Sequence, residues 1–139
     1  MSESASPTAA APHHARGVLD SQHDGQIVLA VPGTSYQIHL SVYQPVNTPA
    51  GKRLVGTIRG QARRIDVVRT GGRYIEPVMG RPRRIQGTVV AIDAAGQTLT
   101  VDAGVPMVCK VDGIQRADQF AVGQLVALDL VPGTGFTPA

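Results

Sequence analysis

The feature that most constrains the fold of this chain is a series of short apolar segments, separated by turn-forming residues, in its second half. Residues 87–93 (GTVVAID), 98–102 (TLTVD) and 106–112 (PMVCKVD) are rich in valine, isoleucine and threonine. Residues 94–97 (AAGQ) and 103–104 (AG) separate them. Segments of this length joined by glycine-containing turns predict an antiparallel meander.

The chain beyond this meander continues in the same way. Residues 115–120 (QRADQF) predict one short helical turn at most, and residues 122–130 (VGQLVALDL) predict a closing strand. Pro132 and Gly133 end that strand, because proline fixes φ and glycine accepts a positive φ. Since the chain also has 16 glycines, 10 prolines and 42% hydrophobic residues, we expect an all-β protein with an aliphatic core.

An internal repeat extends this prediction to the first half of the chain. Residues 17–29 (GVLDSQHDGQIVL) resemble residues 87–99 (GTVVAIDAAGQTL) after an adjustment of one residue. We therefore expect two copies of one small antiparallel unit, at residues 16–70 and 85–139. A chain of about 60 residues hides only ~60% of its unfolded surface, so the copies should pack together, either as two barrels or as one barrel with shared strands.

The segments outside the two copies have compositions of their own. Residues 1–15 are mainly serine, alanine, proline, threonine and histidine, which bury too little apolar surface to fold, so we expect a disordered tail. Residues 71–84 join the copies. Their glycines and prolines exclude a helix and predict a basic, extended connector that runs along a sheet edge.

The second copy resembles the small OB-like β-barrel domains. The run of residues typical of those domains occurs here as Gly87-Thr-Val, Ile92-Asp93, Thr98-Leu-Thr-Val101 and Phe120-Ala-Val-Gly123-Gln-Leu-Val126. Such barrels include uncharacterised bacterial domains and the small periplasmic copper and silver efflux chaperones. Residues 72–84 are similar to a segment of uncharacterised planctomycete proteins. The resemblance implies tandem OB-like barrels in a bacterial protein.

The likeness to the copper and silver chaperones adds a remote alternative function, which is binding of a soft metal ion. Those chaperones use a Met-x-Met pair on the third strand, with a histidine and a tryptophan nearby. Met107 and Cys109 hold the corresponding positions here and would point to one face of the strand. The chain has no tryptophan and the second copy has no histidine, so we expect both to be core residues, with no metal or cofactor.

The sequence offers no recognisable arrangement of catalytic residues. Cys109 lies within an apolar strand, His23 lies in a polar turn, and the acidic residues are spread singly along the chain. There is no glycine-rich phosphate-binding motif such as a P-loop. Nucleophilic catalysis needs a nucleophile beside an oriented base, so we expect a protein without enzymatic activity.

Positive charge is concentrated in one third of the chain. Ten of the 13 lysines and arginines lie between Lys52 and Arg84 with only two acids, so this basic tract carries a net charge of +8 in a chain of +3. Nine of the ten are arginines, whose planar guanidinium groups bind phosphate oxygens in pairs. Tyr74 is the aromatic residue of the tract and its candidate for base stacking. We predict binding of a nucleic-acid backbone through Lys52, Arg53, Arg59, Arg63, Arg64, Arg69, Arg73, Tyr74, Arg81, Arg83 and Arg84.

Two other interpretations of the basic tract stay open. The tract could dock on an acidic protein surface, which would make the chain an interaction or assembly subunit, and homo-oligomers are possible. It could also be a solvated face whose arginines discourage aggregation through sheet edges. The sequence favours neither DNA nor RNA.

The expected location follows from the cysteine content and the N-terminal residues. Cys109 is the single cysteine, so no disulfide can form within the chain. The first residues lack the basic start and apolar stretch of a signal peptide. No segment approaches the ~20 apolar residues that span a bilayer. We expect a cytoplasmic protein without a membrane partner.

Overall fold

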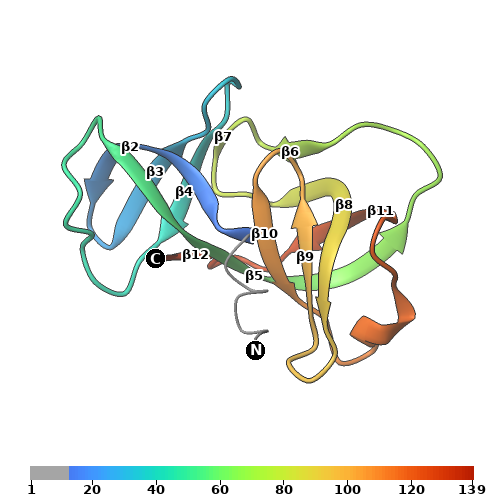
Figure 1. Cartoon of the computed structure of the whole chain (residues 1–139). Helices are drawn as coiled ribbons and strands as arrows, with labels where there is room; N and C mark the ends of the chain where they lie inside the picture. Colours follow the sequence, from blue (N-terminus) through green and yellow to red (C-terminus); the bar gives the residue numbers. More distant parts are fainter. Residues whose placement is uncertain (1–12) are drawn as a thin grey trace, which may run out of the picture.

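The computed structural model describes residues 13–139, and β-strands make up nearly all of its regular structure (Figure 1). The all-β class predicted from the sequence is confirmed. The short 3-10 helix η2 (Ala117–Gln119) lies where the sequence predicts one helical turn. The strands are β2 (Ala15–His23), β3 (Gln26–Ala30), β4 (Gln37–Ser41), β5 (Arg53–Val67), β6 (Tyr74–Glu76), β7 (Met79–Gly80), β8 (Arg84–Asp93), β9 (Thr98–Asp102), β10 (Pro106–Lys110), β11 (Leu125–Leu130) and β12 (Gly135–Pro138).

Five strand segments close a first ring of hydrogen-bonded neighbours. β2 pairs with β3, β3 with β4, β4 with β12 and β12 with the first part of β5, which returns to β2. The pairs are antiparallel except for β4 and β12, which run parallel. Ala15 is buried and lies opposite Gly56 in this ring, so the folded region begins at least one residue before position 16. Residues 1–12 of the expected disordered tail lie outside the described residues.

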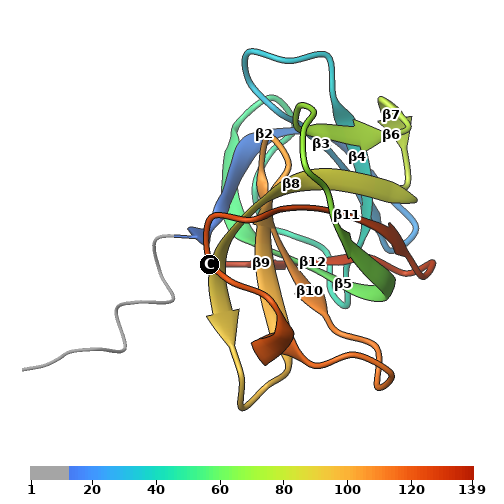
Figure 2. The ribbon, with the colours of Figure 1, turned by 90° about the vertical axis from the view of Figure 1, so that its right-hand side faces the viewer.

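A second ring closes with the same pattern of pairings. β8 pairs with β9, β9 with β10, β10 with the last part of β5 and β5 with β11, which returns to β8. β10 and β5 form the parallel pair of this ring. Figure 1 shows the two rings side by side, and in Figure 2 the second ring faces the viewer.

β5 belongs to both rings and runs from one to the other (Figure 1). Its residues 53–59 pair with β2 and β12, and its residues 59–67 pair with β10 and β11. The sequence assigns residues 59–67 to the first unit and residues 135–138 to the second. In the structure each of these segments pairs within the opposite ring. The sequence could not show this, because alternation along a strand does not encode which strand is its partner.

Aliphatic side chains fill the interior of the two rings. At some positions the backbones of neighbouring strands also approach one another closely. A β-bulge in β5 lies between Ala62 and Ile65, both of which stay buried. Earlier in the same strand, a Cβ atom at Gly56 would overlap the ring of Phe136 and the carbonyl oxygen of Thr137. β12 therefore packs directly on the backbone of β5.

Two short strands lie between β5 and β8 and pair with both rings. β6 pairs with the start of β8, and β7 pairs with β4. The N–H of Ile75 donates to the hydroxyl of Tyr36 at 3.1 Å, which ties β6 to the segment that leads into β4. Among the described residues, no helix has the length and apolar character needed to cross a membrane.

Candidate nucleic-acid interface

The outward side of β5 carries three of the predicted arginines. Burial alternates along the strand, and its odd-numbered residues from Arg53 to Arg63 point away from the ring interiors. Arg53, Arg59 and Arg63 therefore share one side of the strand, here called the β5 outer face, and all three are exposed. The bulge after Ala62 leaves Arg64 exposed as well.

Three other predicted arginines form ion pairs with carboxylates, at 3.0 Å in each case. The pairs are Arg64–Asp66, Arg73–Asp102 and Arg84–Asp129. The remaining seven predicted cations form no ion pair with any carboxylate in the described part of the chain. They are Lys52, Arg53, Arg59, Arg63, Arg69, Arg81 and Arg83. Among the described residues, no carboxylate is paired with these side chains, so an external anion could bind them.

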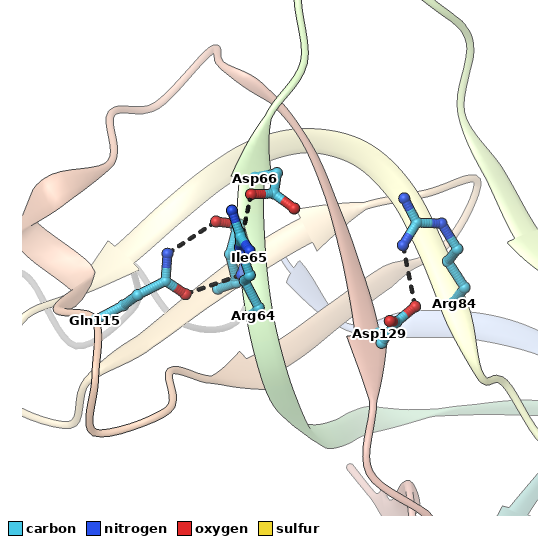
Figure 3. A network of polar contacts seen from close by, with 6 residues as sticks. All are labelled: Arg64, Ile65, Asp66, Arg84, Gln115 and Asp129. Atoms are coloured by element: carbon cyan, nitrogen blue, oxygen red, sulfur yellow. Dashed lines mark hydrogen bonds and ion pairs between the residues drawn. The ribbon is translucent and has the colours of Figure 1, made fainter.

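Arg84 is the most constrained of the predicted cations. Its Nε atom donates to the hydroxyl of Tyr74 at 3.3 Å. Its guanidinium group also donates to Asp129 at 3.0 Å (Figure 3). The hydrogen bond to Tyr74, followed by that to Asp129, raises the pKa of Arg84 above its ordinary value. Tyr74, the predicted stacking residue, is half-buried in β6 with its hydroxyl engaged. It does not lie on the β5 outer face.

A cation from outside the basic tract joins the β5 outer face. Lys110, the last residue of β10, is exposed and lies opposite Gln61, between Arg59 and Arg63 along β5. The structure thus gathers Arg59, Arg63 and Lys110 in one place. The other predicted cations are distributed around it: Lys52 just before β5, Arg53 at its start, Arg64 in its bulge, Arg69, Arg73, Arg81 and Arg83 in the segments between strands, and Arg84 at the start of β8.

Three hollows of 410, 400 and 380 Å³ lie next to one another along β12 and the middle of β5. The first and second share the walls formed by Tyr43, Phe136 and Thr137. The second and third share Arg59, and the third also includes Lys110. We call these three hollows the junction groove, because shared side chains connect each one to the next.

Tyr43 lies in the loop between β4 and β5, with its ring fully exposed. The side-chain amide of Gln22 holds this loop by two hydrogen bonds with Val46: it accepts from the backbone N–H at 2.6 Å and donates to the carbonyl at 3.2 Å. The N–H of Val42 donates to the carbonyl of Gly25 at 2.9 Å. An aromatic ring is therefore presented to solvent from a loop that is tied to the β2–β3 hairpin.

The sequence predictions include neither Tyr43 nor Lys110. Lys110 is a single charge at the end of an apolar strand, and only the parallel pairing of β10 with β5 places it beside Arg59. Tyr43 belongs to a segment of polar residues and prolines, residues 41–50 (SVYQPVNTPA). The sequence does hold one signal of exposure, which is the position of a tyrosine in such a loop. No apolar strand or helix pattern surrounds Tyr43 that would bury its ring.

The residues considered for a soft metal ion lie in the core of the second ring. Met107 and Cys109 are both buried. Burial raises the pKa of the Cys109 thiol to about 12. The described residues contain no group of three or more histidine, cysteine, aspartate or glutamate side chains that could hold a metal ion. Both residues have the surroundings of packing residues.

Comparison of the chain with protein-family models, with curated proteins and with solved structures finds no match. Its chemistry is therefore inferred from its own side chains. A row of guanidinium and ammonium donors beside a fully exposed phenol ring is suited to binding an extended polyanion.

Proposed function

We propose that this protein binds nucleic acid through the phosphate backbone, with Arg53, Arg59 and Arg63 of the β5 outer face as its main contacts. The observation that carries the proposal is the placement of three exposed arginines on one side of a continuous strand. None of the three forms an ion pair with a described carboxylate. Lys110 adds a fourth positive charge next to Arg59.

The spacing of these arginines suits a long ligand better than a small anion. Arg53 and Arg63 are ten residues apart, which corresponds to about 33 Å along an extended strand. A single phosphate group could contact one of them, whereas a polynucleotide backbone could contact all three. Each contact would release condensed counterions, which is the main source of sequence-independent affinity for nucleic acids.

The order of the strands supports the proposal independently of charge. If the strands of the first ring are numbered one to five in chain order, their order around the ring is one, two, three, five, four. Strands three (β4) and five (β12) are the parallel pair. This is the order of an OB-like barrel, a fold that carries oligonucleotides on one sheet face. The second ring has the same order when the last part of β5 takes the place of its fifth strand. We infer two copies of one barrel that exchange their fifth strands.

The test compares two triple variants that remove the same charge. One variant carries R53Q, R59Q and R63Q on the β5 outer face, and the control carries R69Q, R81Q and R83Q elsewhere in the basic tract. All six arginines are exposed and unpaired with described carboxylates, so both variants should keep the fold. The measurement is the affinity for a fluorescently labelled oligonucleotide at low salt, by anisotropy.

We expect the β5 variant to lose most of its affinity and the control to lose much less. Equal losses would place the contacts across the whole tract and would remove β5 from the proposal. No binding of the wild-type protein at low salt would overturn the proposal, and capture of an acidic protein by the β5 outer face would then favour the interaction subunit.

A further inference from the structure

We propose that the ligand is a single strand of nucleic acid that lies in the junction groove and stacks a base on Tyr43. This inference rests on the proposed function and names its ligand class more closely. Two independent features point to it, namely the row of three adjacent hollows and the full exposure of the Tyr43 ring.

The junction groove offers one path for an unpaired strand. Its three hollows follow β12 and the middle of β5, and they lead from the loop of Tyr43 past Arg59 to Lys110. Arg63 lies further along β5 and lines a separate hollow with Ile114. Positive groups therefore occur at the wall between the second and third hollows and again beyond the third.

Tyr43 differs from the other tyrosines of the chain in its surroundings. The hydroxyl of Tyr36 accepts a hydrogen bond from Ile75, and the hydroxyl of Tyr74 accepts one from Arg84. Both of these rings are half-buried, whereas the ring of Tyr43 is fully exposed above the groove. A solvated aromatic face on a loop that is held by hydrogen bonds is a platform on which a base can stack with little loss of loop entropy.

The charges that line the groove are complementary to a phosphate backbone. Arg59 forms a wall of two hollows, and Lys110 lines the third. Asp93 also lines the third hollow and is the one carboxylate among the residues that line the groove. With two cations against one anion, the electrostatic balance of the groove favours a polyanion.

A single strand fits these features better than a duplex. In a duplex the bases are stacked on one another, and the faces that could contact Tyr43 are covered. In a single strand each base has a free π-face, and the adjacent phosphates remain available to Arg59 and Lys110. The groove therefore selects for an unpaired strand without reading the identity of its bases.

The experiment measures binding of a thymidine oligomer of about 20 nucleotides, which exceeds the ~4 to 16 nucleotides that one OB-like barrel covers. A duplex of the same length is the competing ligand. The variants are Tyr43→Ala, the conservative Tyr43→Phe, and Val122→Ala as a control at an exposed apolar residue outside the groove. Tyrosine fluorescence is recorded in parallel, since the chain has no tryptophan.

We expect the single strand to bind more tightly than the duplex and Tyr43→Ala to lose about 5- to 150-fold in affinity, the range for loss of one stacked base. Tyr43→Phe and Val122→Ala should bind like the wild type. Binding should quench tyrosine fluorescence in the wild type but not in Tyr43→Ala.

Equal binding of Tyr43→Ala and wild type, or equal binding of duplex and single strand, would overturn the inference. If the R53Q, R59Q, R63Q variant still lost affinity in that case, the proposed function would stand and only the single-strand groove would fall. Absence of binding to either nucleic acid at low salt would overturn both.

Discussion

The side-chain amide of Gln115 pairs with the backbone of Ile65 as a neighbouring strand would. The N–H of Ile65 donates to Oε1 of Gln115 at 2.9 Å, and Nε2 of Gln115 donates to the carbonyl of Ile65 at 2.9 Å (Figure 3). β10 ends at Lys110, so Gln115 supplies the hydrogen bonds that β5 needs beyond the end of its parallel neighbour. The loop after β10 is thereby fixed beside the bulge that carries Arg63 and Arg64.

Replacing Gln115 by alanine should destabilise the protein. The change leaves the N–H and the carbonyl of buried Ile65 without these partners, which corresponds to about 1–3 kcal/mol in the free energy of unfolding. Urea denaturation followed by circular dichroism measures it. Gln44→Ala, at an exposed glutamine in the β4–β5 loop, is the control and should change stability by less than about 0.5 kcal/mol. A Gln115→Ala variant as stable as this control would contradict a stabilising role for the two hydrogen bonds between Gln115 and Ile65.

Gly56→Ala should weaken the first ring. The added methyl group would overlap the ring of Phe136 and the carbonyl of Thr137, so β12 would have to move away from β5. Overpacking of this kind typically costs about 1–3 kcal/mol. Hydrogen exchange should accelerate at the N–H of Ala139, which donates to Val55 at 2.9 Å.

The matched control for Gly56 is Gly72→Ala. A Cβ atom at Gly72 has no neighbour within 4 Å, so stability should change little or rise slightly. Equal stability of the two variants would mean that β12 does not pack on Gly56.

Cys109 should be inert in the folded protein and should make stability depend on pH in alkaline solution. Burial raises the pKa of its thiol from 9.0 to about 12, so the folded protein keeps the proton where the unfolded chain loses it. The associated stability is complete below pH 9 and is lost as the pH rises toward 12. Unfolding free energies of the wild type and of Cys109→Ala, measured across this range, should converge. Parallel pH profiles, or rapid modification of the thiol without unfolding, would contradict this account.

Local patterns predicted much of the strand content. The strand predicted at residues 98–102 corresponds to β9. The strand predicted from residue 106 onward corresponds to β10, which begins at Pro106. These segments are short and β-branched, and the turns between them contain glycine. The pairing of β12 with β4 and β5 could not be predicted in this way, because Pro132 and Gly133 indicate an end and nothing in residues 135–138 specifies a partner. The repeat of one unit stays a prediction.

Part of the candidate site could also be predicted from local features of the sequence. Composition identifies the basic tract. That Arg59 and Arg63 share one side of a strand is a finding of the structure, because the sequence predictions include no strand over β5. Composition does not show that Arg73 meets Asp102, which is 29 residues away. Nor does it place Lys110 next to the tract or show that Tyr43 is exposed and Tyr74 half-buried. Each of these depends on contacts between segments that are distant in the sequence.

The measurement that tests the central claim most directly is the salt dependence of binding to a single-stranded oligonucleotide. Affinity should fall steeply with salt in the wild type, by ~0.7 in log K per unit of log salt concentration for each neutralised phosphate. If Arg53, Arg59 and Arg63 each neutralise one phosphate, the slope should decrease by about 2 in the R53Q, R59Q, R63Q variant. It should stay unchanged in the R69Q, R81Q, R83Q control. The same slope in both variants, or a wild-type affinity that does not respond to salt, would contradict binding through the β5 outer face.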